Sequence, residues 1–209
     1  ESELRAAKAE VMSSVIEPYA EKVLPSTLIS GELKGSPVVK EEYIKEFDGT
    51  KLTLANGARV WLKYTNNKAD EISMQAFSNG GSSLISDAEL PSASLASTAK
   101  NMCGLGEFSY QDLRKFLSGK NASASAYLSS LNEMITGSSS VKDFETMLQL
   151  TYMAFMPVRH DDEILKSSIQ RSKASLENRR ANPNSVFSDT LSMLMTNYSK
   201  RTNLPTVEY

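Results

Sequence analysis

The spacing of apolar residues changes twice along the chain. Residues 2–23 repeat apolar side chains at helical spacing, with charged residues on much of the remaining surface. Residues 24–40 contain two prolines and two glycines but few large apolar side chains, a composition typical of a linker. We therefore predict a helix that Pro18 shortens or kinks, followed by a linker.

From Lys51 onward the apolar residues alternate with polar ones, which is the period of a half-buried strand. Asn56-Gly57 interrupts the alternation with a strong hairpin signal, because a type I′ turn needs positive φ at both central positions. Alternation resumes over 58–65 and again over 71–78, where Gly80-Gly81 ends it. The pattern predicts three antiparallel strands in sequence order.

Helical spacing dominates the second half of the chain. The predicted helices cover 93–102, 110–117, 141–156 and 161–180, and Pro183 can open a last one. Ser109, Ser140 and the pair Asp161-Asp162 are favourable residues at helix starts. The small, alternating residues of 120–137 predict two more strands. The resulting fold class is α+β, an antiparallel sheet with helices packed on one face.

Composition narrows the classes of function. A chain of 209 residues fits one domain with an appendage, or two small domains. A formal net charge of −2 creates no overall field that would attract nucleic acid or an anionic membrane. The sequence contains neither an apolar run of about 18 residues nor a signal-peptide pattern at its start. We therefore expect no nucleic-acid partner and no membrane span.

His160 is the only histidine, and three acidic residues follow it directly. This cluster could suggest a metal site. However, three adjacent carboxylates at a helix start cannot all face one ion, and zinc prefers further histidine or cysteine ligands. Acids at this place also complement the helix dipole. The sequence thus favours a helix start over a metal centre.

Cys103 is the only cysteine, so neither an internal disulfide nor a thiolate cluster can form. As a nucleophile it would need a nearby base, and only His160 could serve. A buried, unreactive thiol is the favoured interpretation. A hydrolase built on Cys103 and His160 is the alternative, and it requires the two side chains to lie within hydrogen-bond reach.

Glycine clusters and basic residues suggest further sites only weakly. Gly104 and Gly106 follow one predicted helix and Gly119 follows another, without the spacing of a phosphate-binding loop, so helix C-caps explain both clusters. Basic residues also gather near the end of the helix predicted over 161–180. These residues are Arg171, Lys173, Arg179 and Arg180. They are typical of a solvated helix end and too few for a nucleic-acid surface.

Several stretches carry a resemblance to one protein family. The run Leu54-Ala55-Asn56-Gly57-Ala58-Arg59-Val60-Trp61-Leu62-Lys63, with 70–72 and 77–84, resembles the opening hairpin and third strand of the insulinase/pitrilysin-type zinc peptidases. Further matching positions resemble the second half of long bacterial members of that family. They are 104–109, Asp112-Leu113, Leu117, Gly119-Lys120, 137–140, Asp143, Glu145, Gln149-Leu150 and 157–159. The likeness is close over 50–165 and looser on both flanks.

The resemblance implies four similar α+β domains, each an α/β roll, arranged as two halves that close around an unfolded peptide. The first domain of such proteins binds zinc through a His-x-x-Glu-His motif and a distal Glu. The corresponding stretch here, 88–96, has no histidine, so Glu89 alone cannot replace the motif, and Glu177 is an isolated candidate for the distal ligand. The resemblance therefore implies no catalytic, cofactor-binding or metal-binding residue in this chain, with zinc held by another domain of the parent protein.

The resemblance also implies a domain organisation and a role. Residues 1–46 correspond to the end of a preceding domain and the linker between halves, and 47–209 to a noncatalytic domain without its last strand and helix. The expected role is to form part of a closed chamber for an unfolded peptide. The alternative is a purely structural or interaction domain in a parent without peptidase activity. Expected partners are the other domains of the parent chain, the peptide and further copies of this chain, in the bacterial periplasm or cell envelope.

Overall fold

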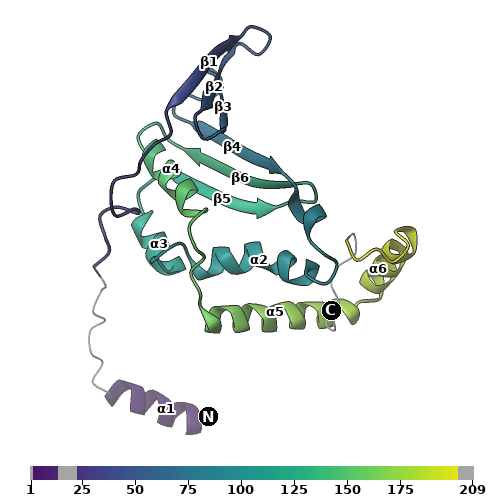
Figure 1. Ribbon diagram of the computed structural model, residues 1–209. Helices are drawn as coiled ribbons and strands as arrows, with labels where there is room; N and C mark the ends of the chain where they lie inside the picture. Colours follow the sequence, from purple (N-terminus) through teal and green to yellow (C-terminus); the bar gives the residue numbers. More distant parts are fainter. Residues whose placement is uncertain (1, 14–22, 202–209) are drawn as a thin grey trace.

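The computed structural model describes residues 2–13 and 23–201 and has the predicted α+β class (Figure 1). The helices are α1 (Ser2–Ser13), α2 (Leu90–Cys103), α3 (Tyr110–Phe116), α4 (Phe144–Met153), α5 (Asp162–Arg180) and α6 (Pro183–Met195), with a 3-10 turn η1 (Gly81–Leu84). The strands are β1 (Val38–Ile44), β2 (Gly49–Leu54), β3 (Arg59–Leu62), β4 (Ile72–Asn79), β5 (Ala122–Leu128) and β6 (Asn132–Ser139). These strands form antiparallel sheets in the orders β1-β2-β3 and β4-β6-β5.

The first sheet contains the predicted hairpin between β2 and β3. Leu52 pairs with Val60 across it, and the N–H of Leu54 donates to the carbonyl of Ala58 at 2.8 Å. The turn itself differs from the prediction, because only Gly57 of the Asn56-Gly57 pair has positive φ, at +87°. A type I′ turn is therefore absent here, and the glycine instead supplies the single left-handed residue of a longer loop.

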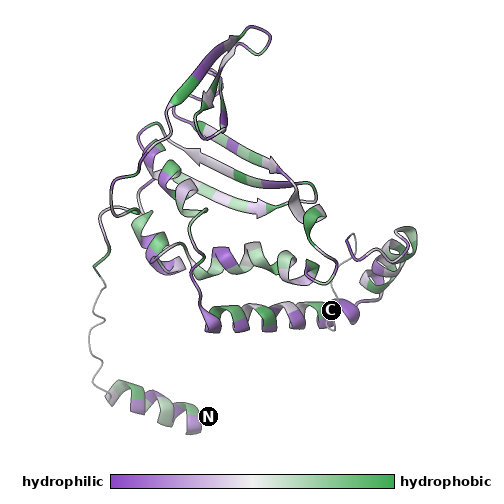
Figure 2. Cartoon of the chain, in the orientation of Figure 1, coloured by the Kyte–Doolittle hydropathy of each residue, from purple (hydrophilic) through white to green (hydrophobic). Residues whose placement is uncertain are grey.

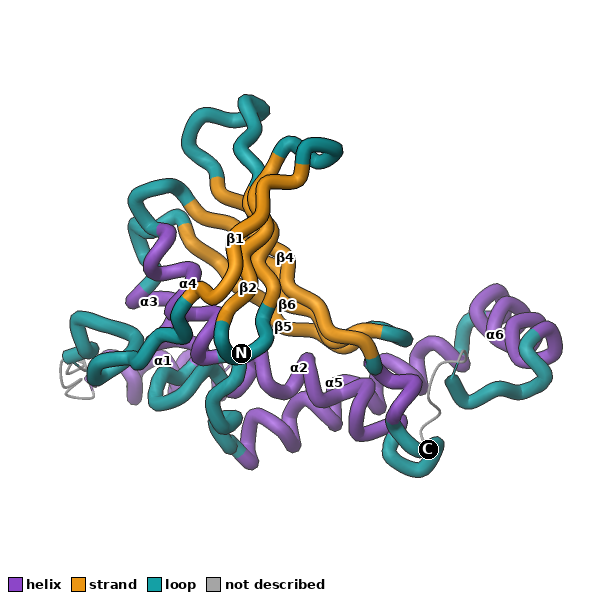
Figure 3. The backbone as a smooth tube through the Cα atoms, turned by 45° about the horizontal axis from the view of Figure 1, so that its top comes forward, coloured by secondary structure: helices purple, strands orange, loops and turns teal. Residues whose placement is uncertain are grey.

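Strand β4 does not continue the first sheet as its place in the sequence suggested. It pairs along its whole length with β6, from Ile72 opposite Ser139 to Asn79 opposite Asn132. The period-two pattern fixes which side chains share a face, but it does not identify the partner strand. The predicted meander of three strands is thus split between two sheets (Figure 3).

Strand β1 was not predicted and lies within residues 1–46. It pairs with β2 from Val38 opposite Leu54 to Ile44 opposite Gly49, with an irregularity after Val38. Its sequence mixes two valines with lysine and glutamates, so the alternation is weak. Pairing with an already formed hairpin explains why this polar segment is extended, because the neighbouring strand supplies its hydrogen-bond partners.

Helices α2 and α4 lie against one face of the second sheet, and α5 packs outside α2 (Figures 1 and 3). The buried core lies between α3, α4 and this sheet and is formed by Leu28, Phe108, Leu150 and Met153. Met147 is fully buried and approaches Gly137 of β6, where a Cβ atom would lie only 3.0 Å from its sulfur. A glycine in this strand thus permits the close packing of α4 on the sheet.

Several helix ends agree with the sequence. The Ser109 hydroxyl accepts from the N–H of Asp112 at 3.1 Å and caps α3, and the Asp161 carboxylate accepts from Ile164 at 3.1 Å and caps α5. Helix α4 begins later than the predicted residue 141, because the hydroxyl of Ser140 caps a preceding turn by accepting from the N–H of Asp143. Helix α1 covers the first half of the predicted helix 2–23, and Pro18 lies outside the described residues.

The chain exposes an unusually large surface. It has 15914 Å² of accessible surface, whereas a compact monomer of 23.0 kDa exposes roughly 9,600 Å². Exposed apolar side chains occur in the first sheet and in α6, and Figure 2 shows the hydrophobic residues along both. Leu62 of β3 is 50% exposed, and Phe187 and Leu194 of α6 are 70% and 57% exposed. These faces have the character of surfaces that contact other protein.

Candidate functional site

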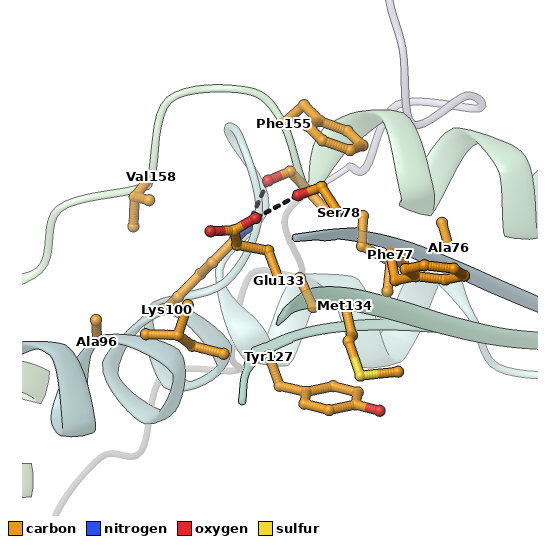
Figure 4. Close-up of a pocket in the computed structure, with 14 residues that line it drawn as sticks. Ala76, Phe77, Ser78, Ala96, Lys100, Tyr127, Glu133, Met134, Phe155 and Val158 are labelled. Carbon is orange, nitrogen blue, oxygen red and sulfur yellow. Dashed lines mark hydrogen bonds between the residues drawn. The ribbon is translucent and has the colours of Figure 1, made fainter. Parts of the chain in front are cut away.

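A cavity of about 420 Å³ lies on the helix-covered face of the second sheet, between α2 and the segment that follows α4 (Figure 4). The three strands of the sheet, α2 and the segment 154–158 all contribute to its wall. The lining residues are Ala76, Phe77, Ser78, Ala96, Lys100, Ala126, Tyr127, Leu128, Glu133, Met134, Ile135, Ala154, Phe155 and Val158. The wall is therefore mostly apolar, with one lysine and one glutamate.

Small side chains create this space. Ile135 lies in register between Ala76 on β4 and Ala126 on β5, and Ala96 contributes from α2. Residues directly opposite each other in neighbouring strands share a face, so these alanines leave room above the isoleucine. Larger residues at these positions would fill the gap between sheet and helix and give the close packing that is normal in protein interiors.

Lys100 of α2 projects to the wall of the cavity (Figure 4). Its Nζ donates to the carbonyl oxygen of Ala154 at 2.5 Å. The side chain is half-buried, and this burial lowers the pKa of the ammonium group because desolvation disfavours its charge. Within residues 2–13 and 23–201, no carboxylate lies within ion-pair distance of Lys100. The cavity thus presents a cation that forms no ion pair with the described residues.

Glu133 faces the same cavity, but its oxygens already have partners. One accepts from the hydroxyl of Ser78 on the adjacent strand, and the other accepts from the N–H of Gly81 at 3.0 Å. These hydrogen bonds stabilise the ionised form and lower the pKa of the Glu133 carboxyl group. Its evident role is to hold the turn after β4 against β6.

Strand β4 lies at one edge of its sheet, since β6 pairs with only one of its sides. The residues at its end, Ala76 to Ser78, also line the cavity. An edge strand presents backbone N–H and C=O groups to which an extended segment can add by strand pairing. An unpaired strand edge and a mostly apolar cavity therefore lie side by side here.

The structure separates Cys103 from His160. Cys103 is buried at the end of α2, with 5% of its surface exposed, whereas the His160 side chain is 77% exposed. His160 Nδ1 lies 3.4 Å from Asp162 Oδ1, and in the described part of the chain no hydrogen bond joins the histidine to the thiol. The arrangement that the Cys103–His160 hydrolase requires is not formed.

The other residues considered from the sequence have local structural contacts. Asp161 caps α5 and lies 3.9 Å from Arg159, while Gly104 and Gly119 have positive φ at helix ends. Arg179 is more than a solvated helix end, because it forms two hydrogen bonds of 2.8 and 2.6 Å with Asp189 of α6. This pairing lowers the pKa of Asp189.

The stretch expected to correspond to the zinc motif forms the start of α2. Its acid, Glu89, accepts a hydrogen bond of 2.7 Å from the hydroxyl of Ser86, and residues 88–96 contain no histidine. Glu177 lies exposed on α5. One carboxylate in a helix start lacks the nitrogen or sulfur donors of a zinc site, so this donor set does not fit zinc. Among the described residues, no group of three His, Cys, Asp or Glu could hold a metal ion.

The sequence analysis did not identify Lys100, Glu133 or the alanines of the cavity. Alanine and serine alternate through β5, which predicts a strand with one small-residue face, but the helix above that face is not visible in the pattern. The search for membrane spans covered the described residues as well. None of their helices combines the length and the apolar character needed to cross a bilayer.

No family model matches the chain, but individual relatives do. A zinc protease PQQL-like protein of Arabidopsis thaliana is 27% identical over 176 residues, which are 84% of this chain and 16% of that protein. The periplasmic protease PqqL from Escherichia coli has the same fold, with a TM-score of 0.74 and 22% identity over 98% of this chain. The ferredoxin protease FusC, crystallised with Arabidopsis ferredoxin, superposes with a TM-score of 0.73 and 14% identity over 99% of this chain.

The chain spans 22% of the PqqL chain and 23% of the FusC chain, so it corresponds to less than a quarter of each. The matched residues include the hairpin, the second sheet and the helices on its face, since nearly the whole chain superposes. Sequence similarity to a zinc protease and the shared fold agree with the motifs found in the sequence. This chain is thus similar in sequence to a zinc protease and shares its fold with PqqL and FusC, as the resemblance to the insulinase/pitrilysin-type zinc peptidases implied.

Proposed function

We propose that this chain is a noncatalytic lobe of a zinc metalloprotease and forms part of a closed chamber that holds an unfolded peptide. Cleavage would take place at zinc in another domain of the parent protein. The observation that carries the proposal is the donor chemistry of residues 88–96, which lack histidine in a domain of the peptidase fold. The zinc protease PQQL-like relative supports a peptidase as the parent.

The cavity and the edge of β4 support a role in holding peptide. An extended polypeptide can pair with the edge strand through its backbone, and alternate side chains then point towards the sheet face that contains the cavity. FusC, a structural neighbour, is a protease crystallised with ferredoxin, which supports a polypeptide as the ligand here. The exposed apolar faces of the first sheet and α6 would contact the other domains of the parent chain. PqqL is periplasmic, which supports a periplasmic or envelope location for the parent.

Binding of an unfolded polypeptide tests the proposal. The purified 209-residue chain is titrated into a fluorescein-labelled, permanently unfolded polypeptide, and fluorescence anisotropy reports the bound fraction. A folded protein of similar mass with the same label is the control. We expect saturable binding of the unfolded polypeptide only, unchanged by a metal chelator.

Two results would count against the proposal. Absence of binding at all concentrations would favour the purely structural or interaction domain. Equal binding of the folded control would show that exposed apolar surface, and not a peptide site, causes the signal.

A further inference from the structure

We propose that the cavity beside Lys100 binds the C-terminal residue of a peptide, with its apolar side chain inside and its free α-carboxylate on the lysine ammonium. This inference rests on the proposed function, because it names the part of a polypeptide that the site recognises. The residues that carry it are Lys100, Ala154 and the alanine-lined space between α2 and the sheet.

The size and the apolar wall of the cavity determine which ligand side chain can fit it. A volume of about 420 Å³ lies within the range of roughly 300–1,000 Å³ that ligand pockets occupy. Leu128 and Ile135 supply branched apolar surface, and Phe155 supplies an aromatic ring. A single aromatic or branched apolar side chain with its own backbone fits such a space and would remove its surface from water.

Lys100 determines which charged group the ligand must carry. Among the described residues, its ammonium donates one hydrogen bond, to the neutral carbonyl of Ala154, and two of its three donors are then available to a ligand. A half-buried ammonium that forms no ion pair with the described residues is poorly compensated, and its desolvation lowers its pKa. A ligand carboxylate would supply the missing charge and accept a charge-assisted hydrogen bond.

Strand geometry favours the α-carboxylate over an acidic side chain. Successive side chains of an extended peptide point to opposite faces, so an acid next to the apolar residue would point away from the cavity. The α-carboxylate of a C-terminal residue is attached to the same Cα as the apolar side chain. It can therefore reach the cavity wall while the side chain is inside.

Glu133 restricts where the carboxylate can lie. Its ionised group faces the same cavity and would repel a second carboxylate. Both Glu133 oxygens are held by Ser78 and Gly81, so this charge stays in place. The ligand carboxylate must therefore lie on the Lys100 and Ala154 side, which further favours a short, defined terminus over a random polypeptide segment.

Matched labelled peptides test the inference with the 209-residue chain. The first ends in phenylalanine with a free carboxylate, and the second is identical but amidated. The third ends in serine with a free carboxylate, and the fourth carries an internal phenylalanine followed by glutamate and an amide end. We expect the first to bind roughly tenfold or more tightly than each of the others, because a hydrogen-bonded charge or a buried ring is lost in each.

Single substitutions test whether the peptide binds in this cavity. Ala96 is exposed at its rim, so Ala96→Trp should block entry without disturbing the core, and Lys100→Met should remove the preference for the free acid over the amide. Ser94→Trp, at an exposed position of α2 that points away from Ala96, and Lys166→Met on α5 are the matched controls, and both should bind like the unchanged chain.

Each contrary outcome is distinct. Equal binding of acid and amide, or binding that Ala96→Trp leaves unchanged, overturns the inference while the proposed function stands if the unfolded polypeptide still binds. Preference for the fourth peptide over the first also overturns it, because the recognised carboxylate would then be an acidic side chain. Failure of these peptides and of the unfolded polypeptide would overturn both proposals.

Discussion

Replacement of Gly104 by alanine should destabilise the fold strongly, because two independent effects coincide there. Gly104 ends α2 with φ of 95° and ψ of −169°, a backbone conformation that residues other than glycine rarely adopt and that costs them roughly 1–3 kcal/mol. A Cβ atom at this position would also lie 2.2 Å from the carbonyl oxygen of Phe108. That oxygen belongs to a backbone pair, in which Leu105 and Phe108 exchange hydrogen bonds of 3.0 Å, and Phe108 is part of the buried core.

The neighbouring backbone cannot move aside as a flexible side chain would, so an overpacking cost of roughly 1–3 kcal/mol adds to the strain. We therefore expect Gly104→Ala to lower the free energy of unfolding by roughly 2–6 kcal/mol. Gly119→Ala is the matched control, because Gly119 also has positive φ, at +79°, but nothing lies within 4 Å of its Cβ position. Strain alone should cost about 1–2 kcal/mol there.

Urea unfolding followed by circular dichroism measures both variants. The difference between them reports mainly the contact with Phe108, and we expect Gly104→Ala to be less stable than Gly119→Ala by roughly 1–3 kcal/mol. A Gly104→Ala variant that is unfolded without urea also agrees with this expectation. Equal midpoints and equal slopes for the two variants would refute the argument from close approach.

Other predictions concern charge, proteolysis, metal content and association. The N–H of Asn121 and the hydroxyl of Ser140 lower the pKa of Asp143 below 3.8. The stabilisation of the fold by the ionised Asp143 is therefore complete above the unfolded-state pKa and is lost as the pH falls through the folded-state pKa. Asp143→Asn should flatten the decrease in Tm below about pH 4. Trypsin should cut after the exposed Lys34 before it cuts within the sheets, and earlier loss of the β2–β3 hairpin would contradict the order of stability. Elemental analysis after dialysis should find no stoichiometric zinc, whereas one tightly bound equivalent would disprove the assignment of residues 88–96. Light scattering should detect a dimer or larger species at micromolar concentration, because α6 and the edge of β4 are exposed, and a constant monomer mass would contradict it.

Features set by nearby residues could be predicted from the sequence. The caps at Ser109 and Asp161 form within three residues of the side chain concerned, so composition and spacing were enough to locate α3 and α5. The hairpin at Asn56-Gly57 was located for the same reason, although its turn type was not. The favoured interpretation of Cys103 as a buried thiol is confirmed by its place at the end of α2.

Features set by distant residues could not be predicted. Strand β4 joins β6, whose residues follow more than fifty positions later, and nothing in the alternation of either strand identifies the other. The same limit applies to the cavity, where Ala76, Ala96 and Ala126 come together only through the packing of α2 on the sheet. Nothing in the sequence distinguishes Lys100 from a solvated lysine on a helix, because its contact with Ala154 joins residues 54 positions apart.

The most direct test of a lobe that binds peptide but does not cleave it measures both properties on one sample. The 209-residue chain is incubated with an unfolded labelled polypeptide, with added zinc or with a chelator. Anisotropy then reports the bound fraction, and mass spectrometry reports the length of the polypeptide. We predict the same bound fraction and an intact polypeptide under both conditions. Fragments that form with zinc, disappear with chelator and persist at a constant rate through further purification of the chain would contradict the account.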